Sequence, residues 1–205
     1  MSNFAHTPRP SCSPWGAIQQ ADQLIPGAWL VSTATHGGIL LSDERQAAMP
    51  DALRITEPAY EEACDWSLPI LAFQDEFVAS PSCRSSWITL ARDIARCWHP
   101  DRFTGHTGEA VPENPSHILR SRAAYQLAIG KFCVTSAWGS WAEWVPDGKV
   151  GVMARKVTAV DHLGHASYDD EERYALVPKD RYDSSIGVNC LDDLDAEIID
   201  KPTVR

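Results

Sequence analysis

The chain of 205 residues lacks the long apolar run of a membrane span and the start of a secretory signal. No window approaches the ~20 apolar residues that cross a bilayer. The opening segment, MSNFAHTPRPSCSPWG, is polar and rich in proline and serine, whereas a signal peptide has a basic start and an apolar centre. We therefore expect a cytoplasmic protein with no membrane partner. We also expect residues 1–13 to form a flexible N-terminal arm.

Cysteine pairs with metal-binding spacing are also missing. The six cysteines include no CxxC pair, and their gaps fit no zinc-site template, so we expect free thiols in a reducing compartment. Three histidines flank the stretch 100–115, which we expect to be a loop, and their spacing matches no template either: His99, His106 and His117. The sequence thus predicts no metal centre and no cofactor.

The common catalytic signatures are absent, and one histidine segment is left to consider. No GxSxG, GxGxxG, P-loop or HExxH pattern occurs. His36 is followed by two glycines and comes directly after the strand expected over residues 28–33. Free backbone amides at such glycines can bind an anion, and the histidine can act as a base, an acid or a ligand. An ordinary hairpin corner is the alternative.

A second polar segment, YEEACDW over residues 60–66, follows a plausible helix cap at Thr56. In the helix that this cap predicts over residues 57–67, the acids Glu61, Glu62 and Asp65 crowd one side and repel one another. A cation, a basic partner or an internal arginine could relieve that repulsion, although acids at a helix start are common. If these acids meet His36, the group would suit a metal site or a histidine–carboxylate pair, and the catalytic group of a hydrolase or transferase would be His36, Glu61, Glu62 and Asp65.

Negative charge is concentrated near the C-terminus. The net charge is −10, and residues 161–200 alone hold 12 acidic and 3 basic side chains. Such a segment repels nucleic acid and attracts basic protein surfaces, although it can also serve simply as a solvated face. Two tryptophans of the same parity precede it, with no basic residue between Lys131 and Lys149. The expected partner-binding residues are Asp169, Asp170, Glu171, Glu172, Asp192, Asp193, Asp195, Trp138 and Trp144.

The order of elements predicts an α+β fold. Apolar residues recur every three or four positions over Arg84–Trp98, which indicates a helix, and a second helix is expected over Ser116–Ile129. The turn Pro146-Asp147-Gly148 separates two strand-like runs and predicts a β-hairpin. We expect one domain over residues 14–190 with a mostly antiparallel sheet, three to four helices in the middle of the chain, and an acidic tail over residues 191–205.

Several motifs resemble a family of domains of unknown function that is carried on proteobacterial plasmids, integrative elements and phages. The motifs are Pro14-Trp15-Gly16, Ser32-Thr33-x-x-His36-Gly37-Gly38, Tyr60-Glu61-Glu62-x-Cys64-Asp65-Trp66 and Glu172-Arg173-Tyr174-x-Leu176-Val177-Pro178. The resemblance implies a setting in which accessory proteins often block restriction or CRISPR nucleases, and it carries no activity.

Three functions follow as expectations. The first is an accessory protein of a mobile genetic element, of anti-CRISPR or anti-restriction type, that binds a basic surface on a host protein, such as a nucleic-acid-processing complex. It would not bind nucleic acid directly. The second is the enzyme with the histidine–carboxylate group, and the third is a structural or regulatory module without catalysis.

Overall fold

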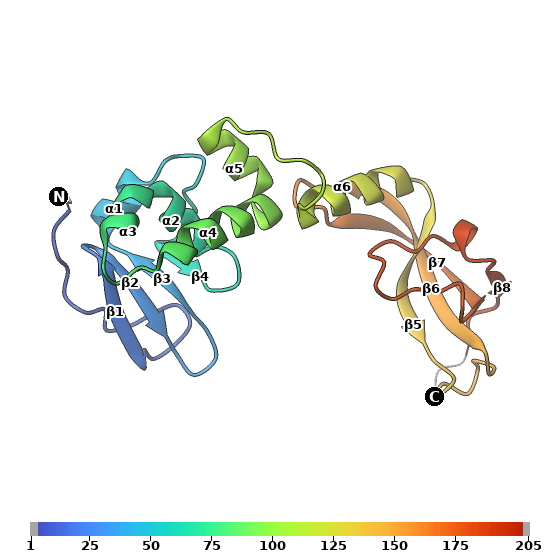
Figure 1. The fold of residues 1–205 in the computed structure, drawn as a ribbon. Coiled ribbons are helices and arrows are strands. Elements are labelled where there is room, and N and C mark those ends of the chain that lie inside the picture. The colour runs from blue at the N-terminus through green and yellow to red at the C-terminus, as the bar shows by residue number, and fades with distance from the viewer. Residues whose placement is uncertain (1–3, 203–205) are drawn as a thin grey trace. The chain divides into compact units, whose positions relative to one another are not determined.

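The chain divides after Ser116 into two compact units, each with its own four-stranded antiparallel sheet (Figure 1). The computed structural model describes residues 4–202. The predicted α+β class with antiparallel pairing is confirmed. The strands lie in two sheets, however, and residues 4–202 form six α-helices where the sequence predicted three to four.

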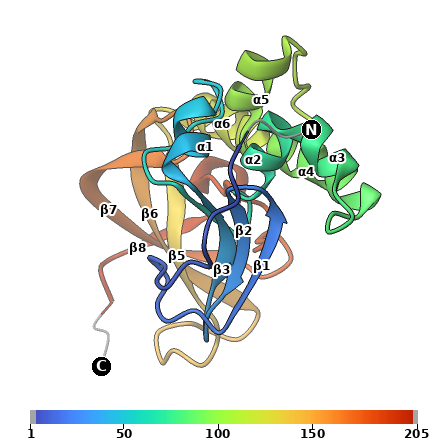
Figure 2. The same ribbon diagram turned by 90° about the vertical axis from the view of Figure 1, so that its left-hand side faces the viewer.

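The sheet of the first unit is a meander in which each strand pairs with the next one along the chain. Short turns join the first three strands, and Gly27 has φ 76° in the turn between the first two. Figure 2 shows the first three strands side by side. The strands are β1 (Gln20–Ile25), β2 (Ala28–Ser32), β3 (Gly37–Leu41) and β4 (Ala59–Glu61).

Five helices complete the first unit, and they share one apolar core with the sheet. The predicted helix over Arg84–Trp98 is confirmed as α4, which buries Ala91 and Ala95 completely. Part of the expected loop over residues 100–115 is a helix, because Pro100 suits a first turn and Phe103 is buried. The helices are α1 (Asp43–Ala48), α2 (Ser67–Ala72), α3 (Gln74–Ala79), α4 (Ser85–Trp98) and α5 (Pro100–Thr107).

The helix predicted over residues 57–67 is wrong, because this segment forms β4 and a turn. Tyr60 pairs with Ile39 of β3, and its side chain is fully buried. Its hydroxyl donates a hydrogen bond of 2.9 Å to Gln46. Burying this ring and pairing the strand outweigh the local helix signals, which tertiary contacts often override.

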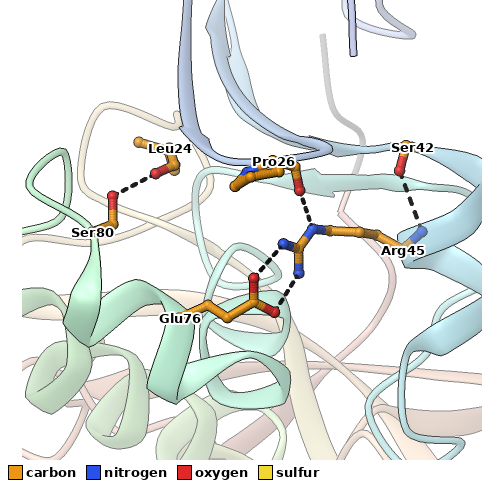
Figure 3. A network of polar contacts seen from close by, with 6 residues as sticks. All are labelled: Leu24, Pro26, Ser42, Arg45, Glu76 and Ser80. Atoms are coloured by element: carbon orange, nitrogen blue, oxygen red, sulfur yellow. Dashed lines mark hydrogen bonds and ion pairs between the residues drawn. The ribbon is translucent and has the colours of Figure 1, made fainter. Parts of the chain in front are cut away.

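A fully buried arginine ties α1 to α3 and to the turn after β1 (Figure 3). The guanidinium of Arg45 makes a two-pronged ion pair with Glu76, at 2.8 and 3.2 Å, and its Nε donates to the carbonyl of Pro26. The rings of Phe4 and Phe73 lie 4.1 and 4.5 Å from the guanidinium carbon. The charge of the guanidinium is therefore paired, and its flat faces are covered by aromatic rings.

The described part of the expected flexible arm, residues 4–13, contacts the rest of the first unit. Phe4 packs edge-to-face on Phe73 with ring centroids 5.7 Å apart. Thr7 accepts a hydrogen bond of 2.9 Å from the indole of Trp29 on β2. Residues 1–3 of the predicted arm lie outside the described residues.

The second unit consists of one helix and a sheet with its own core. The predicted hairpin is confirmed, since Trp138 pairs with Gly151 across it and Gly148 has φ 78° in the turn. Val152 and Val177 on neighbouring strands are fully buried in the core. The elements are α6 (His117–Ala128), β5 (Phe132–Trp138), β6 (Lys149–Val160), β7 (Ala166–Pro178), a 3-10 helix (Leu191–Asp193) and β8 (Glu197–Ile199).

The expected acidic tail is folded into this sheet over its described part. Leu191 and Leu194 are buried in the core, and β8 pairs with β7 through Ile198 and Ala175. Residues 203–205 of the predicted tail lie outside the described residues. Among residues 4–202, no helix is both long and apolar enough to cross a bilayer.

Candidate functional site

One candidate site lies where β3 begins and β4 ends. His36 precedes β3, Glu61 is the last residue of β4, and Glu62 follows it. Antiparallel pairing places Gly38 opposite Glu61, so the start of β3 and the end of β4 lie at the same end of the sheet. The histidine and the two acids therefore meet there. A ring nitrogen of His36 and one oxygen of each carboxylate all lie within 4.8 Å of one another. This site contains three of the four predicted catalytic residues.

The turn before His36 is fixed by a single threonine. The hydroxyl of Thr33 donates to the carbonyl of His36 at 2.8 Å and accepts from its backbone amide at 3.2 Å. The amide of Thr33 also donates to the same carbonyl at 2.8 Å. The backbone that carries the exposed imidazole is thus well anchored.

The two glycines after His36 are required by close packing of the backbone. A β-carbon on Gly37 would lie 2.6 Å from the carbonyl oxygen of Val31, and one on Gly38 would lie 2.1 Å from that of Tyr60. Gly38 also has φ 153°, which residues with a side chain rarely adopt. The hairpin-corner interpretation therefore accounts for the glycines, although it does not account for the histidine.

The two glutamates of the site are held differently. The carboxylate of Glu61 is half-buried and accepts a hydrogen bond of 2.7 Å from the backbone amide of Ala63, which fixes its orientation. The amide of Glu62 donates to the carbonyl of Gly37 at 3.0 Å, which joins its backbone to β3. Its side chain is exposed, so Glu62 is the acid that solvent and ligands can reach.

An apolar groove of about 420 Å³ has Glu62 among its lining residues. Two of its residues, Trp66 and Trp87, contact each other edge-to-face with centroids 6.1 Å apart. The groove thus combines an aromatic wall with a carboxylate, as small-molecule sites often do. Its other lining residues are Leu30, Gly38, Ile39, Leu90 and Ile94.

Asp65, the fourth predicted catalytic residue, belongs to a different group. Its carboxylate lies 3.1 Å from Nε2 of His99, and the thiol of Cys64 donates to the same oxygen at 3.8 Å. The structure groups Asp65 with Cys64 and His99 and not with the other three residues, because the predicted helix that placed the three acids on one side does not form. The sequence places His99 beside the expected loop, as an exposed residue or as part of a weak metal cluster with His106 and His117, and no sequence pattern links it to Asp65, 34 positions earlier.

The thiol of Cys64 is held in its neutral form. Burial, helped by the negative charges of Asp65 and Glu61, raises its pKa to about 11. At neutral pH without a bound cation, the sulfur is therefore a weak nucleophile, because the thiolate is the reactive form.

The predicted partner-binding acids are largely engaged within the second unit. Their ion pairs are Asp170 with Arg155 at 3.1 Å, Glu171 with Arg173 at 2.9 Å, Glu172 with Lys201 at 2.9 Å and Asp195 with Arg181 at 2.9 Å. The remaining predicted acids are Asp169 on β7 and Asp192 and Asp193 of the 3-10 helix.

The two tryptophans predicted to bind a partner pack against each other. The rings of Trp138 and Trp144 meet edge-to-face with centroids 5.5 Å apart, and Trp144 fills the space beside Gly151. Trp141, which lies between these two residues in the sequence, has a side chain that is 77% exposed. The pair therefore contributes more to the packing of the hairpin than to its surface.

Comparison with known proteins places most of the first unit, together with α6, in one family. The model of a domain of unknown function, DUF7007, matches residues 8–129. The chain belongs to the DUF7007 family. The matched range contains both groups of polar side chains, whereas the Glu172–Pro178 motif lies outside it. No curated protein and no solved structure matches the chain.

Proposed function

We propose that the DUF7007 domain is an enzyme of the hydrolase or transferase class. The observation that supports it is the meeting of His36, Glu61 and Glu62 within 4.8 Å, with Glu62 also lining an apolar groove. A histidine beside a carboxylate can take up and release a proton near neutral pH, which is the basis of general acid–base catalysis.

The three side chains take different roles in this proposal. His36 and Glu62 are exposed and exchange protons with the substrate, while Glu61 is held by Ala63 and orients the imidazole. The wall formed by Trp66 and Trp87 binds an apolar or aromatic part of the substrate.

Activity against a panel of chromogenic esters, phosphate esters and glycosides tests the proposal. We expect turnover of at least one class, and a loss of about 100-fold or more in kcat for His36→Ala and Glu62→Gln, as is typical for acid–base residues. Glu57→Gln is the matched control, since Glu57 is an exposed acid just before β4 and outside the group. Thermal melts should leave all three variants close to the wild type. Absence of turnover across the panel, or full activity in both site variants, would contradict the proposal.

A second candidate is the accessory role in a mobile genetic element, acting on a basic protein surface in the anti-CRISPR or anti-restriction manner. Its support is the net charge of −10 and the exposed indole of Trp141. We rank it below the enzyme because four of the seven acids assigned to it pair with the chain's own basic side chains. Capture of a nucleic-acid-processing protein at low salt, lost in Trp141→Ala, would favour it; equal capture by the variant would count against it.

A further inference from the structure

The group formed by Cys64, Asp65 and His99 has the composition of a transition-metal site. It offers one thiol sulfur, one carboxylate oxygen and one imidazole nitrogen, all within 4.8 Å of one another. Zinc binds these three donor types in proteins, and the sulfur disfavours magnesium and calcium, which prefer oxygen. All three side chains are half-buried, so the group is not an exposed acidic surface.

The distances within the group are close to those of a coordinated ion. Nε2 of His99 lies 3.1 Å from Oδ1 of Asp65, and Sγ of Cys64 lies 3.8 Å from the same oxygen. Tetrahedral ligands at zinc bond lengths are separated by roughly 3.3 Å for nitrogen and oxygen and about 3.6 Å for sulfur and oxygen. These two distances thus differ from the zinc values by only about 0.2 Å, and the sulfur and the nitrogen lie within 4.8 Å of each other.

The imidazole of His99 has a nitrogen that needs a partner. Its Nε2 is buried and makes no hydrogen bond to the described residues, although it points toward the group closely enough to lie 3.1 Å from Asp65. A buried nitrogen without a hydrogen bond costs free energy, and a metal ion would satisfy it.

Hydrogen bonds hold the backbone at two of the three ligands, His99 and Cys64. The amide of His99 donates to Ala95 at 2.8 Å and its carbonyl accepts from Phe103 at 2.8 Å, at the junction of α4 and α5. The carbonyl of Cys64 accepts from the hydroxyl of Ser67 at 2.7 Å. Fixed ligand positions of this kind favour metal binding, because little ordering is left to be done when the ion arrives.

We propose that Cys64, Asp65 and His99 bind a divalent transition-metal ion of the zinc class. Three protein ligands leave a fourth position for water or another ligand, as in many metal sites that act on substrates. The inference does not depend on the proposed enzyme, since it concerns a different set of side chains and predicts binding whether or not catalysis occurs.

Cobalt titration tests the inference, because Co²⁺ accepts the ligand set of zinc and its complexes with thiolates absorb in the near ultraviolet. We expect the full-length protein, freed of metal with a chelator, to bind one equivalent of Co²⁺ with this thiolate band. The band should be absent in Cys64→Ser. Asp65→Asn and His99→Gln should bind about 100-fold or more weakly, since even the loss of an outer contact to a ligand costs 10–100-fold.

Matched variants make the result decisive. Cys83→Ser removes another half-buried free thiol and should keep the band, and His36→Ala should keep the affinity. Zinc should raise the melting temperature of the wild type but not of Cys64→Ser. Absence of the band in the wild type, its persistence in Cys64→Ser, or its loss in Cys83→Ser or His36→Ala would overturn the inference. Should His99→Gln not fold, Cys64→Ser and Asp65→Asn decide it alone.

Discussion

At the scale of single residues, Arg45 contributes to the stability of the first unit. A fully buried guanidinium is unfavourable unless its charge and its donors are satisfied. Glu76 and Pro26 accept its hydrogen bonds (Figure 3), and the rings of Phe4 and Phe73 lie over the guanidinium. The carboxylate of Glu76 is itself only 26% exposed, so solvent screens the pair weakly.

We expect Glu76→Ala to lower the free energy of unfolding by ~3 kcal/mol, because it leaves a buried charge without its counter-ion. Asp75→Ala, an exposed acid next to it on α3, should change stability by no more than about 0.5 kcal/mol. Urea denaturation followed by tryptophan fluorescence measures both variants. Equal stability of the two variants would show that the ion pair contributes little.

At the scale of elements, the strand β8 carries the acidic C-terminal segment into the second sheet. Beside this strand, Lys201 donates to the carboxylate of Glu172 on β7, as does the hydroxyl of Tyr174. These hydrogen bonds, that from Lys201 foremost, lower the pKa of Glu172 below its ordinary 4.5. Because the folded pKa is the lower one, the pair stabilises the fold above pH 4.5 and loses that effect as the pH falls through the folded pKa.

Lys201→Met should therefore raise the pKa of Glu172 toward its ordinary value. The carboxyl carbon shift in an NMR titration reports this pKa directly. Lys179→Met, which removes an exposed lysine just after β7, should leave it unchanged. A titration of Glu172 that is the same in the wild type and in Lys201→Met would mean that β8 does not bring the lysine to the acid in solution.

At the scale of the whole molecule, the division into two units changes the meaning of the charge pattern. Residues 117–205 contain 11 basic and 14 acidic side chains, a net charge of −3, while residues 1–116 contain 7 and 14, a net charge of −7. The acidic segment thus folds into the same unit as the basic residues that precede it. The proposed attraction to a cationic partner loses part of its physical cause.

Separate cores predict separate folding. The apolar clusters around Val152 and Cys133 consist of residues from the second unit alone. We expect the fragment 117–205 to unfold cooperatively on its own, with the circular dichroism of an antiparallel sheet. A fragment that is unfolded at 25 °C, beside a full-length chain that melts in one transition, would contradict this expectation.

The sequence by itself determined the local features of this protein. The 3.6-residue period of α4, the Pro146–Gly148 turn and the antiparallel α+β class follow from short-range patterns. Three catalytic candidates were found in the same way, because polar residues beside a diglycine turn stand out locally. The resemblance found from motifs agrees with membership of a family of domains of unknown function.

Only the tertiary structure decided which of these residues meet. Tyr60 pairs as a strand because its ring is buried in the core, and Asp65, in the turn after this strand, lies 3.1 Å from His99. The same long-range packing divided the strands between two sheets and placed the acidic segment against its own arginines and lysine. Such contacts depend on surface that is buried between distant segments, and no local pattern of residues encodes that burial.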